Sequence, residues 1–208
     1  MTNSTSTQMN THRKTAIIVG ILILVAYSVL GSGNPEAKIL GMILEVVSGL
    51  AVITIAILMF PLFKPYNKIA SFLYIVLRSL EGGLLVVTGI LFLSNNTLLL
   101  DIYAGIHAVH GYIFGIAALI FYYLLYLSKL IPRWISVWGA IAAILLIIAN
   151  LLEVMGIASG LMLLYLPIIL NELVLAIWLI VKGFNPSAIV SESANTSINE
   201  DQMTTSTY

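Results

Sequence analysis

The stretch KILGMILEVVSGLAVITIAILMF, residues 38–60, carries charge only at Lys38 and Glu45. An α-helix needs about 20 predominantly apolar residues to cross the hydrocarbon core of a bilayer, so this stretch predicts a transmembrane helix. The rest of the chain has the same character. Of its 208 residues, 60% are hydrophobic and 9% are charged, whereas a soluble domain carries about 25% charged residues. The composition therefore indicates that lipid is the solvent of this protein.

Five further apolar segments accompany residues 38–60, and together they predict an all-α membrane protein, a bundle of six transmembrane helices with short loops. These segments are residues 15–31, 69–93, 102–127, 133–155 and 161–181. Residues 1–12 and 186–208 are rich in Ser, Thr and Asn, and such composition predicts disordered polar tails. The transmembrane domain is thus expected over residues 13–185.

Lys and Arg side chains are distributed unevenly between the predicted loops, and this sets the expected orientation. Seven of them fall at the N-terminus, the second loop, the fourth loop and the C-terminal end: Arg13, Lys14, Lys64, Lys68, Lys129, Arg133 and Lys182. Only Lys38 falls on the opposite side. The bias predicts a multi-pass protein of the cell membrane with both termini in the cytoplasm. An alternative, in which the first segment is a cleaved signal peptide, stays open.

Ionisable residues inside the predicted helices are the candidate functional residues. Each costs about 2.5–3.5 kcal/mol to insert at the membrane centre, so an intramembrane charge indicates a site by default. Six residues from four helices form the candidate polar cluster: Glu45, Arg78, Glu81, His107, His110 and Glu172. Their estimated depths fall within one band roughly 10–15 Å thick. We expect the cluster to face the bundle interior.

Arg78 is expected to anchor this cluster, because a guanidinium cannot lose its proton in a protein and must find a carboxylate when buried. Glu81, one turn further along the same helix, is the nearest partner in sequence. His107 and His110 are likewise three residues apart and are expected to face the interior. Small residues predict close helix packing around them. They are Gly82, Gly83 and Gly89 in the third helix, and Ala108, Gly111, Gly115 and Ala118 in the fourth.

Several function classes have little support in the sequence. The absence of cysteine excludes disulfides and thiolate chemistry, and a net charge of zero gives nucleic acid binding no electrostatic basis. No HExxH, GxSxG or other catalytic pattern is present, so the signal for enzyme activity is weak and a membrane enzyme is a less favoured alternative. We expect no metal site and no cofactor. A haem or metal held by the histidines with a glutamate is a less favoured alternative. Beyond the bilayer, protein partners and a homo-oligomer are open.

Four stretches carry a resemblance to a known family. They are RKTAIIVGILILVAYSVLG (13–31), FYYLLYLSK (121–129), LIPRWISVWG (130–139) and LVLAIWLIVKGFNPSA (173–188). The chain resembles the prokaryotic multi-pass membrane proteins catalogued as domain of unknown function 4386. The resemblance implies an integral membrane protein whose first helix is retained, and it implies no activity.

Two functions fit the residues about equally. In the first, the protein is a membrane subunit or sensor whose intramembrane polar cluster fixes helix packing. In the second, it is a small transporter or ion-coupled carrier that uses the cluster as its site. The sequence does not choose between them.

Overall fold

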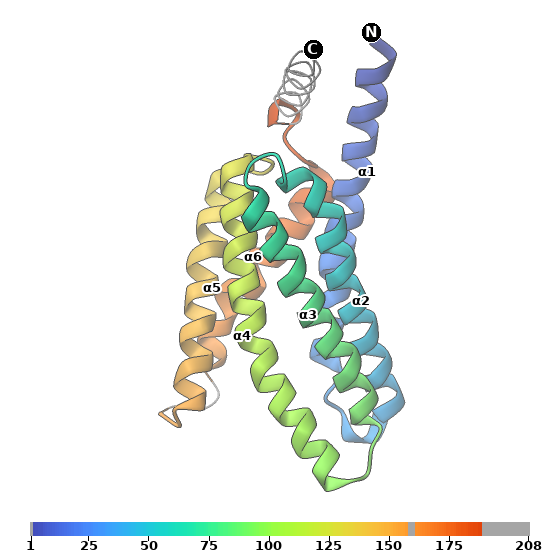
Figure 1. Ribbon diagram of the computed structural model, residues 1–208, viewed down its shortest axis with the longest axis vertical. Coiled ribbons are helices and arrows are strands. Elements are labelled where there is room, and N and C mark those ends of the chain that lie inside the picture. The colour runs from blue at the N-terminus through green and yellow to red at the C-terminus, as the bar shows by residue number, and fades with distance from the viewer. Residues whose placement is uncertain (1, 158–160, 189–208) are drawn as a thin grey trace, which may run out of the picture.

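The computed structural model describes residues 2–157 and 161–188, and within them all regular structure is helical. Six long α-helices follow one another along the chain, with two short 3-10 helices between the first and the second (Figure 1). Their bounds are α1 Thr2–Ala26, η1 Tyr27–Gly31, η2 Pro35–Ala37, α2 Lys38–Phe63, α3 Lys68–Phe92, α4 Thr97–Ser128, α5 Arg133–Val154 and α6 Met162–Val181. All six α-helices contain a segment long and apolar enough to cross a membrane. The protein is therefore a multi-pass membrane protein.

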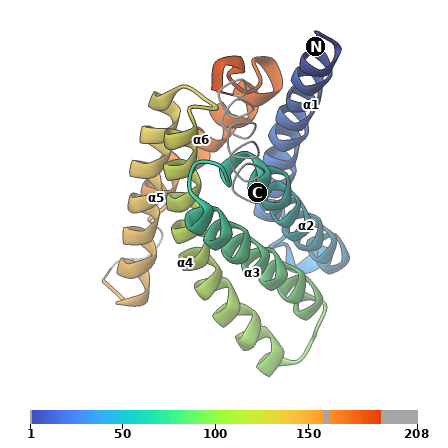
Figure 2. The same ribbon diagram turned by 45° about the horizontal axis from the view of Figure 1, so that its top comes forward.

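The six helices form a closed ring. Each packs against its neighbours in sequence, and α1 closes the ring by packing against α6. Consecutive helices run in opposite directions, so the start of α1 and the end of α6 lie at the same end of the bundle (Figures 1 and 2). Helices that follow one another in sequence are also neighbours in the ring, so short loops are enough to connect them.

The helix bounds agree with the predicted spans to within a few residues, except at the N-terminus. Residues 1–12 were expected to be disordered, but α1 begins at Thr2 and continues through them. No proline or glycine interrupts residues 2–14, so the apolar span that follows propagates its helix into the polar segment. At the other end, the predicted tail 186–208 lies outside the described residues beyond Ala188.

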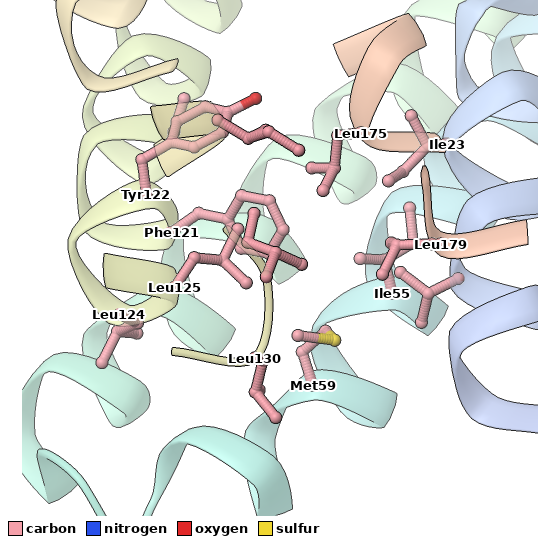
Figure 3. Packing of buried hydrophobic residues seen from close by; sticks show 14 of the residues in the cluster. Ile23, Ile55, Met59, Phe121, Tyr122, Leu124, Leu125, Leu130, Leu175 and Leu179 are labelled. Atoms are coloured by element: carbon pink, nitrogen blue, oxygen red, sulfur yellow. The ribbon is translucent and has the colours of Figure 1, made fainter. Parts of the chain in front are cut away.

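The end of the bundle that carries most of the Lys and Arg residues is filled by a dense apolar core. Figure 3 shows side chains of α1, α2, α4 and α6 meeting there with Leu130 of the loop between α4 and α5, among them Met59, Phe121 and Leu179. The ring of Tyr74 stacks on that of Phe121 at a centroid distance of 5.3 Å. Large side chains here are almost fully excluded from the surface. This end of the ring is closed.

Glycines allow the closest helix contacts, as the sequence predicts. Gly49 of α2 and Gly82 of α3 face each other, and a Cβ atom at either one would collide with the carbonyl oxygen of the other. In α4, a Cβ at Gly115 would lie 2.6 Å from the side chain of Ile147 in α5. The expectation was wrong for Gly83, whose Cβ would meet nothing within 4 Å. Small residues thus seat α3 on α2 and α4 on α5.

Arg13 fastens the first helix to the end of the last. Its Nη2 donates to the carbonyl oxygens of Ile180 (2.9 Å) and Val181 (3.0 Å) at the C-terminus of α6. These carbonyls have no partners within their own helix, and the negative end of the helix dipole lies there. One cationic side chain therefore caps α6 and ties the two ends of the ring together.

Candidate functional site: a polar cavity inside the ring

A cavity of about 400 Å³ lies inside the ring, and all six α-helices contribute to its wall. Most of the lining is apolar, with side chains such as Ile55, Leu85 and Ile168. The dense core lies on one side of it. On the other side the wall includes Leu30, which is 68% exposed, and the exposed Glu153. The cavity therefore opens toward the end of the bundle that carries few basic residues.

The N-terminal half of α4 diverges from α5, as both ribbon views show (Figures 1 and 2), and exposed residues of both helices belong to the cavity wall. Ala108, an exposed residue of α4, lines the cavity at this point. On the facing helices, the Tyr165 hydroxyl bridges Asn150 Oδ1 (3.3 Å) and Glu153 Oε2 (3.1 Å). Polar groups of α5 and α6 therefore border the entrance.

Arg78 and Glu81 form an ion pair in the wall of the cavity. Nη1 of Arg78 lies 3.1 Å from Oε1 and 3.0 Å from Oε2 of Glu81, so one nitrogen engages both oxygens. Both side chains are almost fully buried. The guanidinium also lies 5.3 Å from the ring centroid of Phe114, within the range of a cation–π interaction. The predicted pairing of Arg78 with Glu81 is confirmed.

Glu45 is held by groups from two other segments of the chain, while its buried Oε2 has no hydrogen-bond partner among the described residues. Its Oε1 accepts hydrogen bonds from the hydroxyls of Tyr103 (3.0 Å) and Ser32 (3.2 Å), and Nε2 of His107 lies 3.3 Å away. Glu45 has no exposed surface and does not line the cavity. This carboxyl joins α2 to α4 and to the turn that precedes η2.

Glu172 of α6, unlike Glu45, belongs to the cavity wall. Its side chain is more than nine-tenths buried, yet it lines the cavity. Its Oε2 accepts one hydrogen bond, from the Tyr27 hydroxyl at 2.8 Å. Within the described part of the chain, no Lys or Arg nitrogen lies within 4 Å of it, and Oε1 has no hydrogen-bond partner. Glu172 is thus a buried carboxyl in the cavity wall without an ion-pair partner among the described residues.

The two histidines face the interior, as the sequence predicts, and both line the cavity. His107 contacts the Glu45 carboxyl, and the ring of His110 lies beside that of Phe114. Nε2 of His110 is 3.7 Å from Oε1 of Glu81, too far for a hydrogen bond, and no described residue provides a partner for it. His110 therefore faces the cavity with an unused nitrogen.

Five of the six predicted cluster residues line one cavity, and the sixth, Glu45, lies directly behind His107. Sequence reasoning missed Tyr27, Ser32 and Tyr165, which supply hydroxyl donors to three of the glutamates. The sequence did contain a signal for these residues. Tyrosine and serine hydroxyls are among the few hydrogen-bond donors that an apolar span offers.

The site does not have the form of a metal centre. Across residues 2–157 and 161–188, no group of three His, Cys, Asp or Glu side chains is arranged to hold a metal ion. Each histidine lies against a different glutamate, His107 against Glu45 and His110 against Glu81. The third ligand that a shared metal would need is therefore missing from this arrangement.

Comparison with known proteins agrees with the family resemblance. The family model of domain of unknown function DUF4386 matches residues 17–183, which hold nearly all of the helical ring and every residue of the polar cluster. The chain belongs to this family. No curated protein and no solved structure matches it.

Proposed function

We propose that this DUF4386 member is a membrane-embedded sensor or binding subunit that takes a small, largely apolar molecule into its central cavity. The outer part of the polar cluster, around Glu45, fixes helix packing. The inner part, with Arg78, Glu81, His110 and Glu172, forms the polar wall of the binding site. The observation that carries this proposal is the cavity of about 400 Å³ with buried ionisable groups in its wall.

If the polar cluster served only to fix helix packing, we would expect side chains to fill the interior of the ring. Protein interiors are close-packed, with few voids larger than a water molecule, whereas ligand sites are apolar cavities of about 300–1,000 Å³ with a few polar groups. The cavity here has that size and that lining. Its polar groups also retain unused bonding capacity, at Nε2 of His110 and Oε1 of Glu172.

A carrier is the second candidate, and the shape of the ring weighs against it. Transport requires the site to open to each side in turn. The dense core of Met59, Phe121, Tyr122 and Leu130 closes one end of the cavity, and it would have to separate on every cycle. A site that opens at one end suits a receptor better. The carrier remains the alternative because ionisable residues within transmembrane helices often mark the path of a substrate or ion.

A pair of neighbouring tryptophan substitutions tests the proposal. Ile169→Trp adds volume inside the cavity, whereas Leu170→Trp adds the same volume on a side chain that is 50% exposed on the outer surface. Binding of neopentylbenzene, a small neutral probe, would be measured by equilibrium dialysis in nanodiscs, with empty nanodiscs correcting for partition into lipid. We expect the parent and Leu170→Trp to bind and Ile169→Trp to lose most of the binding. Equal binding by both variants, or none by the parent, would contradict the proposal.

Flux separates the sensor from the carrier. Proteoliposomes preloaded with a probe that binds would be diluted, and efflux would be compared with that of liposomes containing Ile169→Trp. A sensor gives no efflux above the variant. Efflux that depends on the open cavity would replace the sensor with the carrier.

We further propose that both chain ends lie in the cytoplasm and the cavity mouth faces outward. The seven Lys and Arg residues at one end of the bundle support this, since such residues concentrate in cytoplasmic loops. A reporter active only outside the cell would be fused at Asn95–Asn96 and, separately, after Asn185. Activity is expected at the loop alone. Activity after Asn185, or silence at the loop, would reverse the orientation.

The first helix is proposed to remain part of the mature protein. α1 supplies fully buried side chains such as Ala16 and Val19 to the core. A Cβ at Gly20 would lie 2.7 Å from the carbonyl oxygen of Ala176, so α1 seats closely on α6. Removal of α1 would open the ring beside the cavity. The mass of the purified protein checks this directly.

A further inference from the structure

The charges in the cavity wall do not balance. Among residues 2–157 and 161–188, Arg78 is the one Lys or Arg that lines the cavity, and Glu81 engages it with both oxygens. Glu172 lines the same cavity, and its one hydrogen-bond donor among the described residues is the neutral Tyr27 hydroxyl, so it shares the field of Arg78 with Glu81 without being paired to it. Glu153 adds a second carboxyl at the mouth. Among the described residues, the cavity wall therefore contains three carboxyl groups and one Lys or Arg side chain.

We propose that the cavity binds an organic cation with a largely apolar body, and that the Glu172 carboxylate is its counter-ion. This proposal rests on the proposed function and specifies its ligand class. A carboxylate away from water is stabilised by a paired cation or by a proton. A ligand that carries one positive charge provides that pairing and displaces the proton.

Glu172 is the carboxyl best placed for this role. Its side chain is 8% exposed, it faces the cavity, and one of its oxygens has no hydrogen-bond partner among the described residues. Both oxygens of Glu81 are occupied by Arg78. Glu45 lies behind the wall and has no exposed surface. Only Glu172 combines burial, access and spare bonding capacity.

The rest of the wall suits the body of such a ligand. Aromatic rings of Tyr27, Phe114, Phe121 and Tyr165 line the cavity together with aliphatic side chains. Ring faces attract cations, and the Arg78 guanidinium already lies over Phe114 in this way. An anion would have to compete with Glu81 for Arg78. The wall therefore favours a cationic head group with an apolar remainder.

Glu153 is in position to attract such a ligand from outside. It is exposed and lines the mouth, where the Tyr165 hydroxyl orients its Oε2 at 3.1 Å. Charges of one sign at the entrance of an apolar cleft raise the local concentration of an oppositely charged ligand. We therefore assign entry to Glu153 and retention to Glu172.

Three probes of matched shape test the proposal. Benzyltrimethylammonium carries a fixed positive charge, neopentylbenzene is its neutral carbon isostere, and 3-phenylpropanoate is an anion of similar size. Binding to the full chain in nanodiscs would be measured by equilibrium dialysis, with empty nanodiscs as the partition control. We expect the cation to bind about tenfold or more tightly than its neutral isostere, because a desolvated cation gains from both the aromatic rings and the carboxylate.

Two glutamine variants locate the counter-ion. Glu172→Gln keeps the shape of the side chain and an acceptor for Tyr27, so it is expected to bind neopentylbenzene as the parent does and to lose the preference for the cation. Glu153→Gln tests the mouth. Asp101→Asn, which changes an exposed carboxyl of α4 outside the cavity wall, is the matched control and is expected to keep the preference. Retained binding of the neutral probe shows that the variant cavity is folded.

The outcomes distinguish this proposal from the one on which it rests. Equal affinity of the parent for the cation and its isostere overturns the cation proposal and leaves the binding cavity standing. A preference for 3-phenylpropanoate would make Arg78 the anchor and also overturn it. A cation preference that survives in Glu172→Gln but disappears in Glu153→Gln moves the counter-ion to the mouth. Binding of none of the probes contradicts the proposed function itself.

Discussion

Glu45 and Glu172 are both buried glutamates in helices of the same ring, but their surroundings differ. Two hydroxyls and His107 surround Oε1 of Glu45, which lies behind the cavity wall. Glu172 has one hydroxyl partner and lies in the cavity wall. Buried polar groups are normally satisfied by protein partners. Oε2 of Glu45 has no hydrogen-bond partner among the described residues either, so the two glutamates differ in access rather than in bonding capacity. We assign Glu45 to packing because it lies behind the wall, and Glu172 to a ligand because its free oxygen lies beside the cavity.

Substitutions in the Arg78–Glu81 ion pair should have the largest effect on stability. We expect Glu81→Leu to lower stability by about 3–5 kcal/mol, because it leaves a buried guanidinium without its partner. Arg78→Leu should cost less, since the carboxyl that remains can take up a proton and the guanidinium cannot lose one. Melting of both variants and the parent in detergent, at about pH 5 and pH 8, checks this order. If Arg78→Leu is the more damaging at pH 5, the anchor role of Arg78 is wrong.

Glu45 should give the next largest effect, on stability alone. Glu45→Leu deprives Tyr103 and His107 of their acceptor, and we expect a loss of about 1–3 kcal/mol. Glu45→Gln retains an acceptor oxygen and should lose less. Melting curves measure the stability, and dialysis with neopentylbenzene measures the cavity. If Glu45→Gln melts as the parent does but no longer binds the probe, Glu45 belongs to the binding site and the contrast between the two glutamates fails.

Glu172 should give the smallest effect on stability. We expect Glu172→Gln to change it by less than about 1 kcal/mol, because replacing a poorly compensated buried charge removes a desolvation cost along with any attraction. The same melting experiment, run beside Glu45→Leu, provides the comparison. A loss as large as that of Glu45→Leu would show that Glu172 also serves packing.

Much of this arrangement was predictable from the sequence, for identifiable reasons. Long apolar runs define the spans, and the spacing of three between Arg78 and Glu81 places them on one face of a helix. The depth of His107 and His110 placed them at the level of the glutamates. The sequence could not predict how each helix is rotated about its own axis, and therefore which neighbouring side chains it contacts. The partners Tyr27 and Tyr165 are hydroxyls within apolar segments, and only the rotation of each helix turns them toward Glu172 and Glu153.

The cavity was also beyond prediction from the sequence. Depth alone suggested one polar cluster, whereas the structure divides it into a set around Glu45 and a set that lines a cavity. A cavity exists because α4 diverges from α5 toward one end, and the angle between two helices depends on residue sizes at their contact. Gly111 is part of that contact, since its Cβ would lie 2.5 Å from Asn150 Oδ1.

The tie between Arg13 and the end of α6 has a consequence for the order of assembly. A ribosome makes α1 first and α6 last, so the carbonyls that Arg13 caps are synthesised some 170 residues after it. Until then the ring lacks one wall and Arg13 lacks its acceptors. The cavity is therefore enclosed only when the last helix has been inserted, and a chain that stops short of α6 lacks one wall of it.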